Sequence, residues 1–410
     1  MKTDEAREIL CTMTFVDAKD PEGVQPPRIR PHRHSYIPLK PELPLNARNL
    51  VKLAQATPPW ASCIAICTKG RQFYVCGLFD QEIHHRNALN REGSSRFLRP
   101  GLFQLEVTGV GSLAIYDDRK LIATLNQNAV VRTFHDVLNA GPVAKILRRF
   151  SKDLQGEIHD LLAGQMPPQT IDAYWGQDAR DLIAETLSRI LLNIRRLRHG
   201  GAILLTPSER FDDLNVKYQL DYYKAERVIA QHIASSTLSF FTAETIQNEY
   251  LDREDIDEMP ILLHLDDSVT LADVEDTTLA QLGCVNFISS LAGVDGLILI
   301  SPGLTVRGFG VEITGKHDPA KVFVAGDTNA SRARLKRIDL DQFGTRHRSM
   351  MRYCDKYKAS VGFVVSQDGD VRAMTKLPVG LVMWENIQLQ EVDLELNDPS
   401  DNKSSATTRA

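Results

Sequence analysis

A long amphipathic segment that ends in two glycines and runs into a fully apolar stretch most constrains the fold of this chain. Over residues 178–198, apolar side chains recur with a period of 3.6 and form one stripe, as in a helix that covers a core. Gly200 and Gly201 end this helix, because glycine readily adopts the backbone conformation that follows a helix C-terminus. Residues 202–205 are all apolar and predict a buried strand. A helix leading directly into a buried strand indicates an α/β fold.

The rest of the second half alternates between strand-like and helix-like segments. Strands are expected over residues 296–301, 306–313, 322–325, 359–366 and 370–375. Helical segments are expected over residues 219–232, 242–250, 271–282 and 330–338. Pro302-Gly303 supplies a turn between the first two of these strands. The pattern predicts a three-layer α/β domain, in which a central mixed sheet is flanked by helices.

The first half has a different character. Residues 1–45 are rich in proline and predict an extended arm with little core of its own. A short helix over residues 46–56 is followed by expected strands over residues 62–68, 72–79, 102–107, 112–117 and 120–126. Helical residues 130–165 lead to Pro167-Pro168, where we place the main boundary. The expected organisation is an arm (1–45), a smaller β-rich α+β domain (46–168), the α/β domain (169–390) and a disordered tail (391–410).

Composition excludes several classes of protein. A length of 410 residues suggests two or three domains, and a net charge of −5 argues against broad, sequence-independent nucleic-acid binding. The chain has neither the apolar core of a signal peptide near Met1 nor an apolar run of about 20 residues, so no membrane association is expected. Its six cysteines are scattered without zinc-like spacing, which favours a reduced, cytoplasmic protein. Cys63 and Cys67 lie in an expected strand as small buried hydrophobes, and His84-His85 is more typical of surface than of a metal site.

The pentapeptide Gly344-Thr345-Arg346-His347-Arg348 carries the strongest functional signal. It precedes the helical pattern of residues 349–357, so it lies where a helix begins. A helix start already carries partial positive charge, and cations there break the usual charge rule. Such a breach is expected where an anion completes the site, and arginine forks match phosphate oxygens in pairs. The pentapeptide therefore predicts a polyphosphate pocket, although a solvated basic surface would have the same composition.

Three further elements accompany this motif at expected strand ends, where α/β proteins place ligands. They are Gly201-Ala202-Ile203, Asp295-Gly296-Leu297 and Val365-Ser366-Gln367. Together, and in this order along the chain, the four elements resemble those of the diadenylate cyclase (DAC) family. The resemblance covers about residues 172–385, roughly half of the chain. The arginine element is complete and specific, whereas the other three are short.

The resemblance implies an enzyme, a nucleotidyltransferase that condenses two ATP molecules into the second messenger cyclic di-AMP and releases two pyrophosphates. Each subunit of the family holds one ATP, so it also implies a homo-oligomer with two facing sites, as in bacterial signalling proteins. Mg²⁺ or Mn²⁺ fits the chemistry, since phosphate and carboxylate oxygens are hard ligands. Family members of this kind also carry sensor or regulatory modules, which the N-terminal part resembles.

The resemblance also assigns roles to particular residues. Asp295 would act near the 3′-hydroxyl as a base or hold the metal, and His347 would bind phosphate or metal. Arg346 and Arg348 would hold phosphate oxygens during catalysis. The nucleotide would be bound by Gly201, Ala202, Gly296, Leu297, Gly344, Thr345 and Ser366. Structural roles remain open beside these, because Asp295 could cap a turn and Ser366 could close the turn after it.

The sequence departs from the family pattern in ways that bear on activity. Leu297 stands where the family has a small alanine, and it would either crowd the nucleotide or face the core. The acid that commonly precedes the glycine stands further away, at Asp341. Residues 206–267 and 295–346 are longer than usual. Two alternatives follow: a catalytically degenerate sensor that binds ATP or a cyclic dinucleotide, and an interaction protein whose basic loop contacts an acidic partner.

Overall fold

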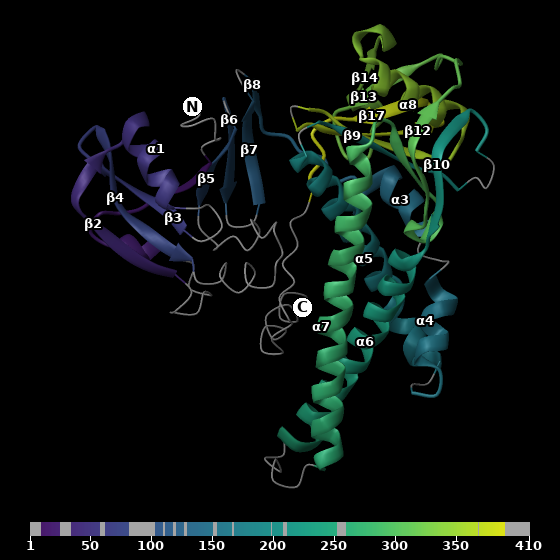
Figure 1. Ribbon diagram of the computed structural model, residues 1–410, viewed down its shortest axis with the longest axis horizontal. Coiled ribbons are helices and arrows are strands. Elements are labelled where there is room, and N and C mark those ends of the chain that lie inside the picture. Colours follow the sequence, from purple (N-terminus) through teal and green to yellow (C-terminus); the bar gives the residue numbers. More distant parts are fainter. Residues whose placement is uncertain are drawn as a thin grey trace. The chain divides into compact units, whose positions relative to one another are not determined.

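The computed structural model describes residues 10–24, 34–57, 62–81, 103–109, 111–117, 120–126, 129–150, 154–165, 168–197, 199–207, 211–251, 260–367 and 369–389 (Figure 1). His84, His85 and the tail over residues 391–410 lie outside these ranges. The chain divides into two compact units, Met1–Phe134 and His135–Ala410. Among the described helices, none is both long and apolar enough to span a membrane.

The N-terminal unit is built on a mixed sheet of eight strands. Their order across the sheet is β2-β4-β3-β1-β5-β6-β7-β8. The strands are β1 (Cys11–Phe15), β2 (His34–Pro44), β3 (Ser62–Lys69), β4 (Gln72–Gln81), β5 (Gln104–Gly109), β6 (Ser112–Asp117), β7 (Lys120–Asn126) and β8 (Ala129–Val131). A 3₁₀ turn (Pro21–Val24) and helix α1 (Ala47–Ala56) complete the described elements of this unit. The five strands expected between residues 62 and 126 are confirmed.

The first 45 residues differ from the extended arm that their prolines predict. Strand β1 lies inside the sheet between β3 and β5, and Cys11 and Met13 are buried in the core. Strand β2 carries Pro38, Pro41 and Pro44 at the edge of the sheet, paired only with β4 among the described strands. Proline is tolerated on an edge strand because its missing N–H removes no bond from the interior of the sheet.

Helix α1 forms where the sequence predicts it. Asn46 is its N-cap, and its side chain accepts a hydrogen bond from the backbone N–H of Asn49 at 2.9 Å. Leu50 and Leu53 pack against the cluster that contains Cys11 and other residues of the sheet. The two faces of this sheet have separate clusters, because successive strand residues point to opposite sides.

The C-terminal unit contains a mixed sheet of nine strands in the order β10-β12-β11-β9-β15-β16-β17-β13-β14. Its strands are β9 (Gly201–Leu205), β10 (Leu214–Tyr222), β11 (Leu297–Ile300), β12 (Val306–Ile313), β13 (Val322–Ala325), β14 (Leu335–Ile338), β15 (Val361–Val365), β16 (Val371–Leu377) and β17 (Gly380–Trp384). Its α-helices are α3 (Gly141–Phe150), α4 (Leu154–Leu162), α5 (Pro168–Arg196), α6 (Lys224–Ile246), α7 (Ile261–Ser290) and α8 (Thr345–Lys356). A π-helical turn (Gln247–Leu251) follows α6.

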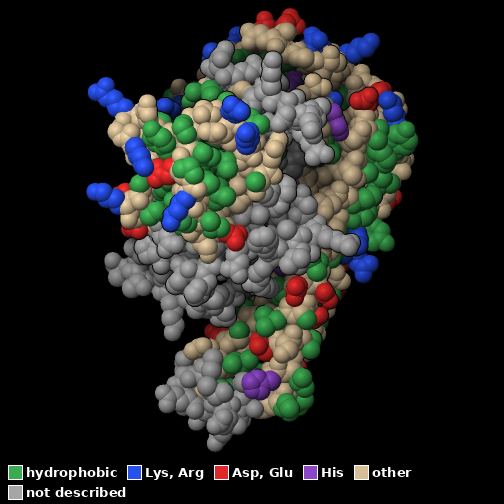
Figure 2. Space-filling view, turned by 60° about the vertical axis from the view of Figure 1, so that its left-hand side comes forward, with side chains coloured by type: hydrophobic (Ala, Val, Ile, Leu, Met, Phe, Trp, Pro, Cys, Tyr) green, Lys and Arg blue, Asp and Glu red, His purple; other side chains and the backbone are tan. Residues whose placement is uncertain are grey.

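Helices cover both faces of this sheet, as the sequence predicts. On one face, Ile203, Leu205 and Phe363 share a buried cluster with residues of α3 to α7. On the other face, Ala202 and Leu204 pack in a second cluster with residues of α8. The alternation along β9 explains why every residue of this strand is buried. Beyond the sheet, α6 and α7 continue as a helical hairpin (Figure 1), on whose projecting part hydrophobic and acidic side chains lie next to each other (Figure 2).

The division between the units falls earlier than the boundary expected at residue 168. Helices α3 and α4 belong to the C-terminal unit, because Val143, Leu147, Leu154 and Ile158 are buried in the same cluster as α5. Helix α5 itself begins at Pro168, which is the first helical residue. Proline suits this position because it has no N–H to leave unpaired there. The proline pair therefore separates two helices within one unit.

Three strands of the C-terminal unit differ from the sequence prediction. Residues 219–222, expected in a helix, belong to β10, and α6 begins only at Lys224. The expected basic helix over residues 330–338 is a 3₁₀ turn (Arg332–Arg334) followed by the edge strand β14. Strand β17 was not expected at all. The other expected strands of this unit, which are β9, β11, β12, β13, β15 and β16, are confirmed.

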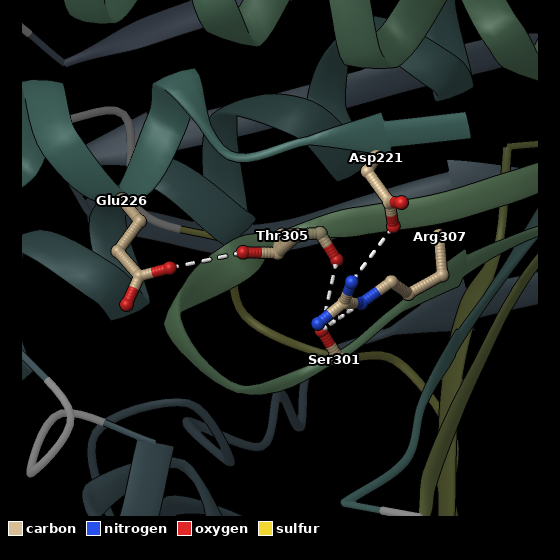
Figure 3. A network of polar contacts seen from close by, with 5 residues as sticks. All are labelled: Asp221, Glu226, Ser301, Thr305 and Arg307. Atoms are coloured by element: carbon tan, nitrogen blue, oxygen red, sulfur yellow. Dashed lines mark hydrogen bonds and ion pairs between the residues drawn. The ribbon is translucent and has the colours of Figure 1, made fainter. Parts of the chain in front are cut away.

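A polar network fixes the turn between β11 and β12, where Pro302-Gly303 predicts it (Figure 3). Arg307 donates from Nε to the Ser301 hydroxyl at 3.0 Å, and its Nη1 lies 2.7 Å from the Asp221 carboxylate. Thr305 donates to the Glu226 carboxylate at 2.9 Å. The network connects the end of β10, the start of α6 and the β11–β12 turn. It therefore stabilises the sheet at the ends of β10 and β11.

Candidate functional site

The four sequence elements that predict a nucleotide site meet on the opposite side of the same sheet, where β9 and β11 begin and β15 ends. We call this row of strand ends the edge of the candidate site. Strands β9 and β11 are parallel neighbours, so Gly201 and Gly296 stand near their common starting edge. Strand β15 runs antiparallel to β9 and pairs Val365 with Gly201, so it ends at this edge. Because α8 precedes β15 and packs on it, the first turn of α8 lies near this edge too. Residues far apart in the sequence are thus gathered in one place.

Helix α8 begins with an open N-terminus. Gly344 is its N-cap, no side chain caps it, and the first turn contains no acidic residue. Among the described residues, nothing lies within 4 Å of the position that a Cβ on Gly344 would occupy. The N–H groups of the first turn carry partial positive charge and suit an anion. The described structure thus leaves room for a side chain at Gly344, and it shows no packing reason for this glycine.

Arg346 contacts the backbone at the start of β9. A Cβ built on Gly200 would lie 2.8 Å from Nη1 of Arg346 and 2.8 Å from the carbonyl oxygen of Val365. Gly200 also has a φ of +71°, which favours glycine. Arg346 is otherwise exposed. Its guanidinium therefore lies over the junction of β9 and β15, and it does not point away from the sheet.

His347 is held as a neutral acceptor. Arg372 of β16 donates from Nη1 to Nε2 of His347 at 3.1 Å. Burial, and then the positive charges of Arg372 and Arg346, lower the pKa of His347 to about 4. The imidazole is therefore uncharged at neutral pH. The ring of Phe343 lies beside it, with ring centroids 5.9 Å apart.

Further arginines add positive charge to this edge. Arg348 lies 3.8 Å from the Asp341 carboxylate, while its Nε is buried without a hydrogen-bond partner in the described structure. Arg372 lies 3.4 Å from the Glu385 carboxylate and 3.9 Å from that of Asp370. Carboxylates thus neutralise these arginines in part. A buried guanidinium N–H without a partner favours an incoming acceptor, because such a group otherwise loses a hydrogen bond.

Asp295 stands at the same edge but two strands away from the arginines. Its side chain is exposed, just before β11. The backbone at Gly296 and at Val365 is separated by two strand spacings, on the order of 10 Å. On its other side is Lys217 of β10. The pKa of Lys217 is raised, chiefly by its hydrogen bond to Glu312, and the charge of Asp295 makes the smallest contribution. The carboxylate therefore borders the opposite end of the candidate site from Arg346.

Gly296 has a structural explanation of its own. Its φ is +125°, and a Cβ there would lie 2.5 Å from the backbone carbonyl carbon of Gly310. Neither condition suits a residue with a side chain. The Asp-Gly pair thus belongs to a close approach between β11 and β12, whatever its functional role.

Three of the residues expected to bind the nucleotide have their Cα–Cβ direction toward the core and not toward solvent. Leu297 and Ala202 are buried in the cluster beneath α8. A Cβ on Gly201 would lie 2.6 Å from Ile194 of α5, so this glycine permits close helix packing. Leu297 therefore faces the core, which answers the question raised by its size. Only the backbone of these residues borders the edge.

Ser366 closes the turn between β15 and β16. Its hydroxyl oxygen accepts from the N–H of Asp370 at 3.0 Å, and its backbone N–H donates to the carbonyl of Asp370 at 2.8 Å. The hydroxyl hydrogen is not part of these bonds. The structural role left open in the sequence is thus present. A donor role toward a ligand is compatible with it.

The two residues expected to hold a metal differ in their suitability. Among the described residues, no three His, Cys, Asp or Glu side chains form a group that could hold a metal ion. Nε2 of His347 faces the Arg372 guanidinium, and a cation is disfavoured beside two arginines. The exposed Asp295 carboxylate is the kind of ligand that Mg²⁺ uses together with substrate phosphates. The donor set fits a metal at Asp295 and does not fit one at His347.

Arg372 is a site residue that the sequence prediction missed. It lies on β16 directly opposite Val364 of β15, two positions beyond the turn residue Asp370. The expected hairpin of β15 and β16 contained the signal, because pairing places a charged residue of β16 beside the end of β15. Comparison of the sequence with protein-family models gives no match, and the search of curated proteins gives none either.

Proposed function

We propose that the C-terminal unit binds ATP at the edge formed by the starts of β9, β11 and α8 and the end of β15, and acts there as a diadenylate cyclase. The observation that carries this proposal is the convergence of all four family-like elements at one sheet edge, although residues 201 and 366 are far apart in the chain. Because the elements were identified by their sequence alone, their convergence supports a common site.

Phosphate binding rests on the arginines and on the helix end. Arg346 lies in the first turn of α8, whose N-terminus has no side-chain cap, and its Nη1 lies beside Gly200 at the start of β9. Arg348 contributes a buried N–H without a partner. Neutral His347 offers Nδ1 as a donor when Nε2 accepts from Arg372. These groups would neutralise and orient a triphosphate without needing a proton transfer.

The reaction would join two nucleotides in two equivalent steps. In each, the 3′-hydroxyl oxygen of one ATP forms a bond to the α-phosphorus of the other. The bond from that phosphorus to the oxygen that bridges to the β-phosphate breaks, and pyrophosphate leaves with the bonding electrons. The hydroxyl proton would pass to a base, for which Asp295 is our candidate because its carboxylate is exposed at this edge. Two such steps close the ring of cyclic di-AMP.

Each active site would require two copies of the chain, since one edge offers one set of phosphate-binding groups. Mg²⁺ or Mn²⁺ bound with the nucleotide would supply charge neutralisation at the phosphates. Asp295 is the residue that would hold it, through its carboxylate. In this proposal His347 serves the phosphates and not the metal.

A catalytically degenerate nucleotide sensor is the second candidate. It is favoured by the position of Asp295 beside the Lys217–Glu312 ion pair of 2.6 Å, since the backbone at Gly296 and at Val365 is separated by two strand spacings, on the order of 10 Å. A base at that distance from the phosphate-binding groups would contribute less to proton transfer. The phosphate-binding groups would be unaffected, so nucleotide would bind without turnover.

The N-terminal unit would regulate this site as a sensor or regulatory domain. Its separate cores on both faces of an eight-stranded sheet support an independently folded unit. The signal it senses is not part of the proposal.

The test is to incubate the purified full chain with ATP and either Mg²⁺ or Mn²⁺, and to look for cyclic di-AMP by mass spectrometry. We expect Arg346→Ala and Asp295→Asn to abolish product while circular dichroism stays unchanged, because both side chains are exposed. Arg332→Ala and Asp160→Asn are matched controls, since both are exposed residues of the same unit outside the candidate site: Arg332 precedes β14, four strands away from β15 in the sheet, and Asp160 lies on α4. They should retain product formation.

Calorimetry with ATP separates the two candidates. If no cyclic di-AMP forms with either metal but ATP binds, and Arg346→Ala abolishes this binding, the degenerate sensor is supported. Absence of both product and nucleotide binding would overturn both candidates. Equal activity in Arg346→Ala and in the unmodified chain would contradict the site itself.

A further inference from the structure

Helix α7 is apolar on two faces, and within the described part of the chain only one of them is covered. Gln281, Cys284, Val285, Ile288 and Ser289 are buried toward α5 and α6. A second set of large apolar side chains on α7 is exposed to solvent. The exposed fractions are 75% for Ile261, 70% for Leu262, 54% for Leu265, 58% for Val269 and 45% for Leu279. Exposed large apolar side chains grouped on one helix are typical of an interaction site.

Four of these side chains, together with Ala272 and Asp276, follow the spacing of a coiled-coil seam. Leu262, Leu265, Val269, Ala272, Asp276 and Leu279 are separated alternately by three and four residues. We call these six residues the α7 stripe. With this spacing they correspond to the a and d positions of a heptad repeat. From Leu262 to Leu279 the stripe runs for about 26 Å at 1.5 Å per residue, enough for a partner helix of about five turns.

The borders of the α7 stripe are acidic. Asp266 and Asp273 each follow a d position, and Glu275 precedes the a position of Asp276. Helix α7 contains no lysine or arginine from Ile261 to Ser290. Hydrophobic and acidic side chains share the projecting part of the hairpin in Figure 2. Charges at the positions that flank a seam set the choice of partner.

We propose that the α7 stripe binds an amphipathic helix of a partner protein that carries lysine or arginine beside its own apolar seam. Apolar residues of the partner would pack between those of the stripe, and its cations would pair with Asp266, Asp273 and Glu275. Asp276 stands within the seam and would set the register by pairing with a cation opposite it. A polar residue at a single a position is known to specify register in this way.

Charge is the reason for choosing this occupant over a second copy of the chain. Two α7 helices packed through their stripes would bring acidic borders together in either relative direction. Like charges across such a seam are destabilising, and Asp276 would be buried without a cation. A basic partner removes both difficulties. This inference concerns the helical hairpin and is independent of the function proposed for the sheet edge.

The test uses the full chain and a defined probe. The probe is a fluorescent 21-residue helical peptide with leucine at a and d, lysine at e and g, and alanine or glutamine elsewhere. A matched peptide has glutamate at e and g. Fluorescence anisotropy should show binding of the lysine peptide at least tenfold tighter than that of the glutamate peptide, and added salt should weaken it.

Two variants separate the seam from its borders. The double variant Leu265→Gln/Val269→Gln should bind the lysine peptide at least tenfold more weakly. Its fold should survive, because both side chains are more than half exposed. Asp266→Lys/Asp273→Lys should reverse the preference and favour the glutamate peptide. A misfolded protein would not gain that preference. Ile37→Gln, at an exposed apolar residue of the N-terminal unit, is the control and should change neither affinity.

Several outcomes would overturn the proposal. Equal binding of the two peptides, or no binding of either, contradicts a basic partner. Unchanged affinity in Leu265→Gln/Val269→Gln removes the α7 stripe as the binding surface. If light scattering shows an oligomer that this variant dissociates, a second copy covers the stripe instead.

Discussion

Arg372 and His347 form a hydrogen-bonded pair in which the arginine donates and the imidazole accepts, over 3.1 Å. The pair connects the first turn of α8 to β16. It makes His347 part of a cationic surface without adding charge of its own. Its consequences can be measured without knowledge of any ligand.

The first prediction concerns the titration of His347. Burial and two nearby arginines lower its pKa to about 4 in the folded protein, from an ordinary value of 6.5. Between these values the unfolded chain binds more protons than the folded chain, so the free energy of unfolding should fall as pH falls from about 6.5 to 4. Above pH 6.5 this contribution is fully present. NMR of the imidazole resonances would measure the titration, and an ordinary pKa would contradict the pair.

A variant isolates this effect from other titrating groups. His347→Gln keeps an acceptor for Arg372 and cannot be protonated. Its free energy of unfolding should depend less on pH between 4 and 6.5 than that of the unmodified chain. An unchanged pH dependence, followed by urea denaturation at several pH values, would show that His347 is not the group responsible.

The second prediction concerns Leu297, which stands where the diadenylate cyclase family, which the sequence resembles, has alanine. Its side chain is buried beneath α8. Leu297→Ala should therefore lower the free energy of unfolding by about 2–5 kcal/mol through lost burial and a cavity. It should not improve nucleotide binding. A more stable variant, or one with much tighter ATP binding by calorimetry, would mean that Leu297 crowds the ligand.

The third prediction compares two glycines of the candidate site. Gly296→Ala must place a side chain at a φ of +125° and 2.5 Å from the Gly310 backbone, so a loss of about 1–3 kcal/mol or more is expected. Gly344→Ala meets no described atom within 4 Å, so its loss should be limited to the smaller cost of alanine at an N-cap, about 1 kcal/mol or less. It should, however, weaken ATP binding if the ligand approaches the helix end. Thermal unfolding and calorimetry of the two variants provide the measurement, and equal losses of stability would contradict the geometry.

The fourth prediction concerns the cysteines. All six are free and buried. Burial raises the pKa of Cys11 to about 11 and that of Cys76 to about 12, and it also raises the pKa values of Cys63 and Cys354. Because the thiolate is the reactive form, a thiol reagent should label none of them quickly at pH 7 in the native state. All six should react after denaturation. Rapid labelling of a native cysteine would mean that its surroundings open.

The fifth prediction separates charge from geometry at Arg346. Arg346→Lys keeps the positive charge but loses the planar fork that matches phosphate oxygens. We expect ATP to bind at least tenfold more weakly, with the fold unchanged because the side chain is exposed. Arg332→Lys is the matched control. Full ATP affinity in Arg346→Lys would reduce the role of Arg346 to that of a point charge.

Much of the fold could be predicted because its core elements have strong patterns. The stripe over residues 178–198 and the apolar run 202–205 became α5 and β9, since burial on one face or on both leaves a period in the sequence. Strand β10 has a pattern of the same kind, since Leu214, Val216 and Tyr218 alternate with polar residues. The short strand β14 carries Leu335 and Ile338 three residues apart, a helical spacing, so its strand state depends on pairing with β13.

The candidate site was predictable only in part. Its arginine motif could be placed at a helix start, because the apolar spacing of α8 is clear. The partner of His347 could not, since Arg372 reaches it through the pairing of β15 with β16. The roles of Gly201 and Gly296 also depend on neighbours distant in sequence, Ile194 and Gly310. A packing constraint and a ligand contact can both require glycine, so the sequence alone does not distinguish them.

The chain returns to one sheet edge at four points between Gly200 and Ser366. A molecule held there would bridge segments that local opening of the unit must separate. Loaded protein should therefore resist proteases as a single block, with cleavage of α8, β9 and β15 slowed together, and the time course of digestion would report occupancy of the edge.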